Sequence, residues 1–306
     1  MGTFRPISRA ATTFAVGQPR LGPLAELPGL WMGTGFNMVS RPDFHQQKPF
    51  FLEINGTQET LEFTKIGGQI PNRGSKQDDA FLNGLHYLQE VSDCASHGAL
   101  HIEPGLWIFV PATTVPNVTE PTVVRQATIP HGDSLLAQST LILEVPKGPT
   151  IDSVDSFPFT DAVIPPLHGT PKNPVTNPDY LKQFSEGQLS RCCLPDGLNL
   201  NAVVKDPTEV LRAQIKGQNI VKTVVLAIST AAVAGSTGIL NIPFVVSNAN
   251  AAQMDAIFWI ETVQPTDGEP FMQLQYVQRV ILDFPPAPMA ANIHWPHISV
   301  ATLVKQ

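Results

Sequence analysis

The stretch Asn292-Ile-His-Trp-Pro-His-Ile-Ser-Val-Ala-Thr-Leu-Val-Lys305 places two histidines around a Trp-Pro pair and continues directly into an apolar segment. From Ile298 to Val304 the residues are apolar and mostly β-branched, which is typical of a strand packed on both faces. Pro296 has no N–H to give to a β-ladder, so strand pairing is expected to begin beside it. The stretch therefore predicts a closing β-strand with His297 at its entrance.

These residues leave two interpretations of His297 open. A histidine at a strand end is commonly neutral and satisfied by a backbone carbonyl, in which case it has no function. A histidine at the mouth of a barrel can instead be the axial ligand of a metal or of haem iron, because barrel mouths often bind small molecules.

The chain of 306 residues has few charges: 15% are Asp, Glu, Lys or Arg, whereas 42% are hydrophobic. This composition provides ample core and little solvated surface, so we expect a self-associating protein, a homo-oligomer. The formal net charge is −7 and no run of Lys or Arg occurs. Both features argue against nucleic acid and against an anionic membrane surface as partners.

The sequence predicts a soluble protein in the cytoplasm, with no membrane partner. No stretch of about eighteen uninterrupted apolar residues occurs, and residues 1–18 lack the apolar centre of a secretory signal. Cys94, Cys192 and Cys193 are odd in number and lack metal-finger spacing. We expect all three to be reduced thiols.

Proline-rich segments divide the chain. Residues 1–28 contain four prolines and little periodicity, so we interpret them as an arm laid over the body or onto a partner subunit. Residues 29–306 are expected to form a single β-barrel domain in which 146–218 is an insertion. Its first part, 146–205, is a proline-rich excursion ordered by docking. The signature Asp206-Pro-Thr-Glu209 then provides an N-cap, an N1 proline and a capping-box glutamate, and it predicts one short helix.

Period-two alternation elsewhere predicts a mainly β fold, an antiparallel barrel. The segment 49–63 is expected to be a strand pair or one bulged strand, and Trp31 is expected to plug the closed end. Besides the closing strand, the segments predicted to be strands are 29–36, 49–63, 81–91, 99–110, 122–129, 134–145, 220–230, 242–247, 256–264 and 271–284.

The motifs of the common enzyme classes are absent, since there is no dinucleotide-binding glycine fingerprint, phosphate-binding loop, nucleophile elbow or zinc-protease helix. On the segment 99–110, His101 and Glu103 share one face, and a structural hydrogen-bonded pair is the simpler interpretation. What remains is a β-barrel with five scattered histidines: His86, His101, His131, His294 and His297.

Three short motifs resemble those of the nitrobindin-like haem-binding barrels of the calycin group. They are Gly29-x-Trp31-x-Gly33, His101-Ile-Glu103-Pro-Gly105-Leu-Trp107 and Trp295-Pro-His297-Ile. The resemblance covers roughly residues 29–145 and 219–304 and implies a calycin-like antiparallel barrel enlarged by insertions. In that family a Pro-His before the final strand supplies the proximal haem ligand, so the resemblance implies that His297 holds the iron. The chain departs from the family in its length, in the 146–205 excursion and in Pro104, which interrupts the middle motif.

The sequence leaves three functions open. The first is a haem-binding barrel that acts on or senses nitric oxide, peroxynitrite or a peroxide, with His86, His101 and His131 as candidates for the distal side. The second is a lipocalin-like or fatty-acid-binding-like carrier of an apolar small molecule without metal, in which the histidines are structural. The third is a structural oligomer module without a ligand. Soret absorption of the protein from a haem-supplied host distinguishes them.

Overall fold

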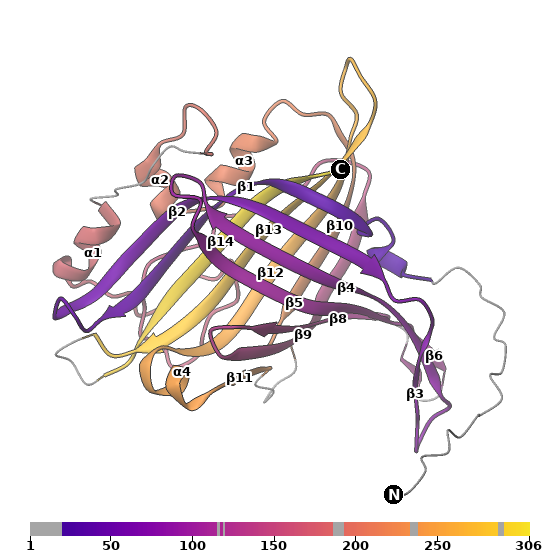
Figure 1. The fold of residues 1–306 in the computed structure, drawn as a ribbon, viewed down its shortest axis with the longest axis horizontal. Helices are drawn as coiled ribbons and strands as arrows, with labels where there is room; N and C mark the ends of the chain where they lie inside the picture. The colour runs from indigo at the N-terminus through magenta and orange to yellow at the C-terminus, as the bar shows by residue number, and fades with distance from the viewer. Residues whose placement is uncertain (1–19, 115–116, 119, 186–192, 233–237, 287–290) are drawn as a thin grey trace, which may run out of the picture.

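The computed structural model describes residues 20–306 apart from 115–116, 119, 186–192, 233–237 and 287–290. Ten long antiparallel strands in this part of the chain form one closed barrel (Figure 1). They are β1 (Gly29–Asp43), β2 (Lys48–Lys65), β4 (Ala80–Asp93), β5 (Ala99–Val110), β8 (Thr122–Ile129), β9 (Asp133–Val145), β10 (Ile220–Ser229), β12 (Asn250–Val263), β13 (Phe271–Phe284) and β14 (Ile293–Lys305). Each pairs with the next barrel strand along the chain, and β14 pairs with β1 to close the circle. The predicted mainly β, antiparallel barrel is confirmed.

The remaining elements are short. Residues 49–63 lie in the continuous strand β2, so the alternative of a strand pair is wrong: β2 pairs with β1 from Gly29↔Phe63 to Asp43↔Lys48. The short elements of the described residues are η1 (Gly22–Leu24), β3 (Ile70–Asn72), β6 (Thr113–Thr114), β7 (Asn117–Val118), β11 (Ile239–Asn241), α1 (Pro178–Ser185), α2 (Leu200–Lys205), α3 (Glu209–Gln214) and α4 (Pro243–Asn248).

One end of the barrel is closed by Trp31, as predicted. Its side chain is fully buried, and its indole N–H donates to the Leu27 carbonyl over 2.7 Å. Leu21 and Leu24, from η1 and the residue before it, join the same interior core. Of the predicted arm, residues 1–19 lie outside the described residues, whereas residues 20–28 lead into this plug.

The glycines around Trp31 allow β1 to approach β14 closely. A Cβ atom at Gly33 would lie 2.1 Å from the Thr302 carbonyl oxygen, and one at Gly35 would lie 2.2 Å from that of Val300. Any side chain there would push the two strands apart. The Gly-x-Trp-x-Gly pattern thus allows β1 and β14 to pair closely where the barrel closes.

The long insertion packs on the outside of its own barrel. Val145 at the end of β9 pairs with Thr223 of β10, so the residues between them leave the barrel wall and return to it. Val203 of α2 and Leu211 of α3 join a second core outside the barrel, together with Ile298 and Val300 of β14. Figure 1 shows α1, α2 and α3 on the flank of the barrel beside β1 and β2. This docking supplies the core that the proline-rich sequence lacks.

The expectation of one short helix is wrong for the described residues, which contain four α-helices. The predicted helix is present as α3, but the predicted cap is wrong: its N-cap is Thr208, whereas Asp206 is the C-cap of α2 and accepts the Thr208 N–H over 3.2 Å. In α2 the cap is Asn199, whose side chain accepts N–H groups of the first turn. Helix α4 replaces the strand predicted over 242–247, because Pro243 at N1 fixes a helical φ.

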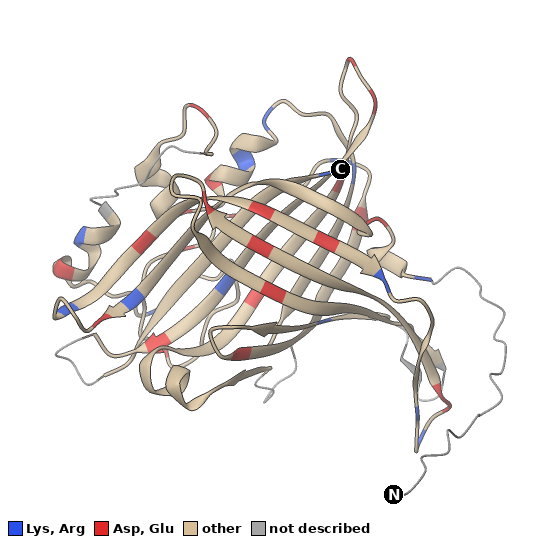
Figure 2. Ribbon diagram, in the orientation of Figure 1, with Lys and Arg blue, Asp and Glu red and all other residues tan. Residues whose placement is uncertain are grey.

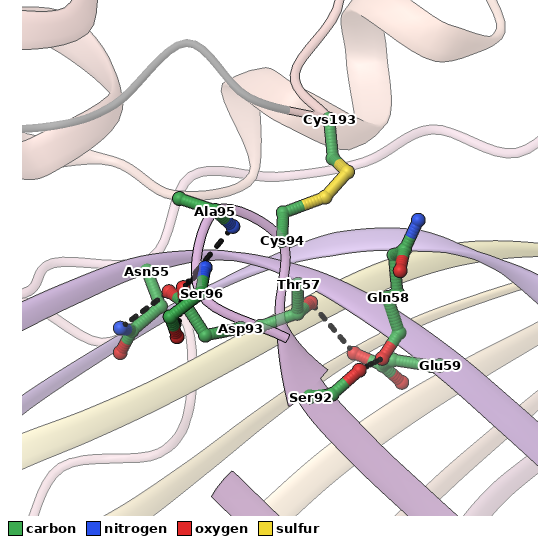
Figure 3. Close-up of a disulfide and its surroundings, with 10 residues drawn as sticks. All are labelled: Asn55, Thr57, Gln58, Glu59, Ser92, Asp93, Cys94, Ala95, Ser96 and Cys193. Atoms are coloured by element: carbon green, nitrogen blue, oxygen red, sulfur yellow. Dashed lines mark hydrogen bonds between the residues drawn. A yellow bond between two sulfur atoms is a disulfide. The ribbon is translucent and has the colours of Figure 1, made fainter. Parts of the chain in front are cut away.

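The expectation of reduced thiols is wrong for two of the three cysteines. Cys94 and Cys193 form a disulfide (Figure 3), and Cys192 lies outside the described residues. Cys94 is in the turn between β4 and β5, next to Asp93, whose carboxylate accepts the N–H groups of Ala95 and Ser96. The disulfide therefore ties the insertion to this turn. The number and spacing of the cysteines could not reveal this pair, because the two residues are 99 positions apart and meet only in the folded chain.

Candidate functional site

His297 points into the barrel at the end opposite Trp31. On β14, Ala301 and Leu303 belong to the interior core, whereas Ile298 and Val300 belong to the core outside the barrel. Because side chains alternate along a strand, His297 lies on the inner face. The predicted start of the closing strand is wrong, because β14 begins at Ile293 and pairs with β13 on both sides of Pro296. Only the pairing with β1 begins after the proline, at Ile298. The ring of His297 faces inward.

The ring of His297 is neutral and held from one side. Its Nε2 donates to the Asn37 amide oxygen over 2.8 Å, and Ser299 Oγ donates to the same oxygen over 2.9 Å. Burial, as the largest cause, and the nearby His101 and His131 together lower the pKa of His297 to about 3. With the proton on Nε2, the ring lone pair is on Nδ1, which accepts no hydrogen bond from the residues that the structure describes.

Two of the other predicted histidines lie near His297, and one does not. His101 of β5 and His131 of the β8–β9 turn have ring centroids 6.1 Å apart. Both are close enough for their charges to affect the pKa of His297. His86 is exposed on the outer face of β4, opposite Leu106 of β5. The structure therefore gathers His297, His101 and His131 at one end and leaves His86 outside.

A buried ion pair lies beneath His101. Arg125 Nη2 donates to Glu103 Oε1 over 2.5 Å, and the two side chains are 2% and 0% exposed. Arg125 also donates to Tyr87 and Gln278, over 3.0 and 2.7 Å. Burial on its own would raise the pKa of Glu103, but the Arg125 charge and hydrogen bonds from His101 and Tyr87 lower it to about 2. The carboxylate is therefore ionised, and the predicted His101–Glu103 pair is confirmed at 3.3 Å.

A second polar group surrounds Glu59 in β2. Tyr276 donates to Glu59 over 2.6 Å and Thr57 over 3.0 Å, while Gln89 donates to the Tyr276 oxygen over 3.0 Å. Burial raises the pKa of Glu59 in spite of these hydrogen bonds. The interior at this end is therefore polar, unlike the apolar interior around Trp31.

A hollow of about 790 Å³ has lining residues on both faces of the barrel wall, with Glu59 and His101 on the inner face and Met32 and Ile102 on the outer face. Its walls come from β1, β2, β4, β5 and the β8–β9 turn, and they include Glu59, Val91, His101 and His131. The volume is within the range of small-molecule sites. His297 is not among the residues that line it.

His294 has a different role from His297. Its Nδ1 lies 2.5 Å from an Asp283 carboxylate oxygen and its Nε2 lies 3.0 Å from the Asp161 carbonyl oxygen. Both partners are acceptors, so both ring nitrogens must carry protons. His294 also forms an isolated β-bridge with Phe159 of the insertion. This histidine fastens the insertion to β14.

The residues at the polar end fit a haem in three respects. Haem iron needs a single imidazole ligand, which must be neutral, and His297 has this protonation state. Metal-bound imidazoles normally donate their other N–H to an oxygen acceptor, as His297 does to Asn37. The ring is also buried on the inner face of the barrel. In the described residues, no group of three or more His, Cys, Asp or Glu side chains could hold a bare metal ion.

Several residues of this site were missed in the sequence. Arg125 could have been found, because a charge between Val123 and Ala127 interrupts the apolar face of a predicted strand. Glu59 has a weaker signal of the same kind between Thr57 and Leu61. Asn37 has none, since an asparagine after Gly33-x-Gly35-Phe36 is an ordinary strand-end residue.

Comparison with known proteins assigns the chain to no family. No known family model matches the chain, and neither does any curated protein. Among solved structures, the crystal structure of Rv2717c from M. tuberculosis is similar with a TM-score of 0.42 and 15% identity. The match covers 94% of this chain and 98% of that one. No helix in the described part of the chain has the length and apolar character of a membrane span.

Proposed function

We propose that the polar end of this barrel binds haem, with His297 as the axial ligand of the iron. The proposal rests on one observation: His297 is a neutral, inward-facing imidazole with one nitrogen held by Asn37 and a lone pair on the other. The resemblance to the nitrobindin-like barrels in the calycin group, stated above from three motifs, adds support.

The residues at the polar end would have different roles in haem binding. His297 would bind, and Asn37 would fix the orientation of its ring. His101, whose Nε2–H donates to Glu103 over 3.3 Å, would stand with His131 on the opposite wall, and the two rings would face a small ligand. When bound, the haem iron supplies the affinity and the redox chemistry for nitric oxide, peroxynitrite or a peroxide. Glu103 would fix the orientation of the His101 ring.

Titration of the apoprotein with haem, followed by Soret absorption, tests the proposal. His297→Ala is expected to lose haem and to keep its β-rich circular dichroism, because it removes the single protein ligand of the iron. His294→Ala and His86→Ala are matched controls, one fastening the insertion and one on the outer face, and both are expected to keep haem. Equal occupancy in wild type and His297→Ala would falsify the assignment.

The hollow favours a second candidate, a carrier of an apolar small molecule without metal. Val91 and Leu100 line it, and His297 does not. A fluorescent fatty acid is then expected to bind the apoprotein. Its affinity should be unchanged in His297→Ala and lost in Val91→Trp, which fills the hollow. Loss of the probe in His297→Ala but not in Val91→Trp would exclude the carrier.

A further inference from the structure

An apolar surface protrudes beside the candidate site, on β11 and α4. The exposed fractions are 75% for Leu240, 49% for Ile242, 71% for Phe244 and 56% for Val246, and no residue of α4 is buried. Leu136 of β9, which is 54% exposed, lies beside β11 because its N–H donates to the Gly238 carbonyl. We call these five residues the α4 patch. Monomeric proteins rarely expose so many large apolar side chains together.

The backbone beneath the α4 patch is firmly fixed. Ile242 N–H donates to the Gly132 carbonyl over 2.9 Å. The Asn241 side chain donates to the Ala251 carbonyl over 3.0 Å and accepts the Ala251 N–H over 3.3 Å. A Cβ atom at Gly132 would lie 2.5 Å from Ile242, so this contact is already tight. The patch is therefore presented in a fixed conformation, which lowers the entropy lost on association.

The segment that carries the α4 patch is free of charge, and Asp283, which pairs with Asn250 just after α4, is itself paired with His294. No Asp, Glu, Lys or Arg occurs from Thr223 to Met254, and α4 carries neither blue nor red in Figure 2. Asp133, opposite Asn241, is on the inner face of β9 because Leu135 belongs to the interior core. A charged partner would find no complement here, and an anionic membrane would find no Lys or Arg. A second copy of the chain meets no repulsion at this place, despite its net charge of −7.

The area of the patch suits a dimer. Five side chains that each expose roughly 100 Å² give about 500 Å² of apolar surface per copy. A standard interface buries about 800 Å² per partner, of which somewhat more than half is apolar. The patch alone thus provides the apolar core of such an interface, and a two-fold axis places the same patch on both sides.

From these observations we infer that the α4 patch is the surface through which two copies of this chain associate. The inference does not depend on haem. It assigns the expected homo-oligomer to β11 and α4, whereas the proline-rich insertion docks on its own barrel. Ile242 also touches the turn that carries His131. Association therefore stiffens one wall of the candidate site.

Sedimentation equilibrium of the full chain without haem tests the inference. The wild type is expected to be a dimer at micromolar concentration. The double variant Leu240→Glu/Phe244→Glu is expected to raise the dimer dissociation constant at least 100-fold, because it places four carboxylates in the interface. Phe44→Glu is the matched control: Phe44 is 83% exposed in the β1–β2 turn, and this variant should remain dimeric.

Unchanged thermal melting and circular dichroism establish that each variant is folded, since the substituted side chains are exposed. A wild type that is monomeric at 100 µM overturns the inference, as does a double variant that is as dimeric as the wild type or a Phe44→Glu variant that dissociates equally. A monomeric wild type that floats with phosphatidylcholine vesicles, in a manner lost in the double variant, would assign the patch to a lipid surface instead.

Discussion

The His297 ring donates its Nε2 proton to the amide oxygen of Asn37 across the β1–β14 seam, over 2.8 Å. This bond chooses the tautomer of the imidazole and directs its lone pair, through Nδ1, away from β1. A side chain that touches no iron can in this way control an iron ligand.

Asn37→Leu is expected to weaken haem binding about 10- to 100-fold, because loss of an oriented acceptor typically costs a metal site that much affinity. The measurement is a haem titration by Soret absorption. Ser299→Ala is the control, since Ser299 donates to the same oxygen without touching the ring, and its effect should be smaller. An unchanged affinity in Asn37→Leu would show that the ring needs no such support.

Removal of one partner of the Glu103–Arg125 pair is expected to destabilise the barrel. Arg125→Met leaves a buried carboxylate without its counter-charge, and the free energy of unfolding should fall by about 3–5 kcal/mol. The double variant Glu103→Met/Arg125→Met should lose less than either single variant, because no buried charge remains. Urea denaturation of the four proteins checks this, and additive losses would contradict it.

The same pair predicts sensitivity to acid. The pKa of Glu103 is lowered to about 2 from 4.5, so its contribution to stability is complete above pH 4.5 and is lost as the pH falls towards 2. Urea midpoints at pH 7 and pH 3 should differ more in the wild type than in Arg125→Met. Equal pH dependence in both proteins would assign acid unfolding to other carboxylates.

His294 predicts a loss of stability on the alkaline side. The hydrogen bond to Asp283 raises the pKa of His294 above 6.5, against the effect of burial, and the Asp161 carbonyl acts in the same direction. A histidine with a raised pKa stabilises the fold fully below its unfolded value and loses this contribution as the pH rises through the folded value. The wild-type melting temperature should therefore fall from pH 6 to pH 9.

His294→Gln provides the comparison, because glutamine can donate a hydrogen bond but does not titrate. This variant should melt lower than the wild type at pH 6, with the difference shrinking towards pH 9. Parallel curves for the two proteins would mean that His294 is neutral in the folded state.

The disulfide between Cys94 and Cys193 predicts one reactive thiol per denatured, unreduced chain, because the sequence contains three cysteines. Cys94→Ser is expected to lower the free energy of unfolding by about 2–4 kcal/mol, since the cross-link restricts the unfolded chain. Cys192→Ser, which leaves the disulfide intact, should not change it. Three reactive thiols in the unreduced wild type would rule out the cross-link.

The barrel was predictable from the sequence because side chains alternate between the two faces of each strand, and this alternation is visible in a short stretch of sequence. Alternation along 99–110 and 271–284 reports two faces with different surroundings, and both segments are strands. Helix α4 was not predicted, because Phe244, Val245 and Val246 are β-branched or aromatic and have the composition of a strand. There the N1 proline outweighs side-chain preference.

The candidate site was only partly predictable, for a different reason. His297 is marked by its neighbours Trp295 and Pro296, whereas Asn37 matters only through a contact 260 positions away. Alternation assigns a residue to a face but does not give its neighbour across a seam. Arg125 lies between these cases, since its position on an apolar face is local and its partner Glu103 belongs to another strand.

The pairing between β1 and β14 can form only late in synthesis, because the two strands lie at opposite ends of the barrel sequence. At roughly 5–20 residues per second, a ribosome completes Asn37 on the order of 13 to 52 seconds before His297. Until β14 arrives, β1 has an open edge and the polar interior lacks one wall. A nascent or truncated chain therefore has the histidines of β5 and the β8–β9 turn but no complete pocket. Occupancy of the site would report that translation reached the last strand and that the circle closed.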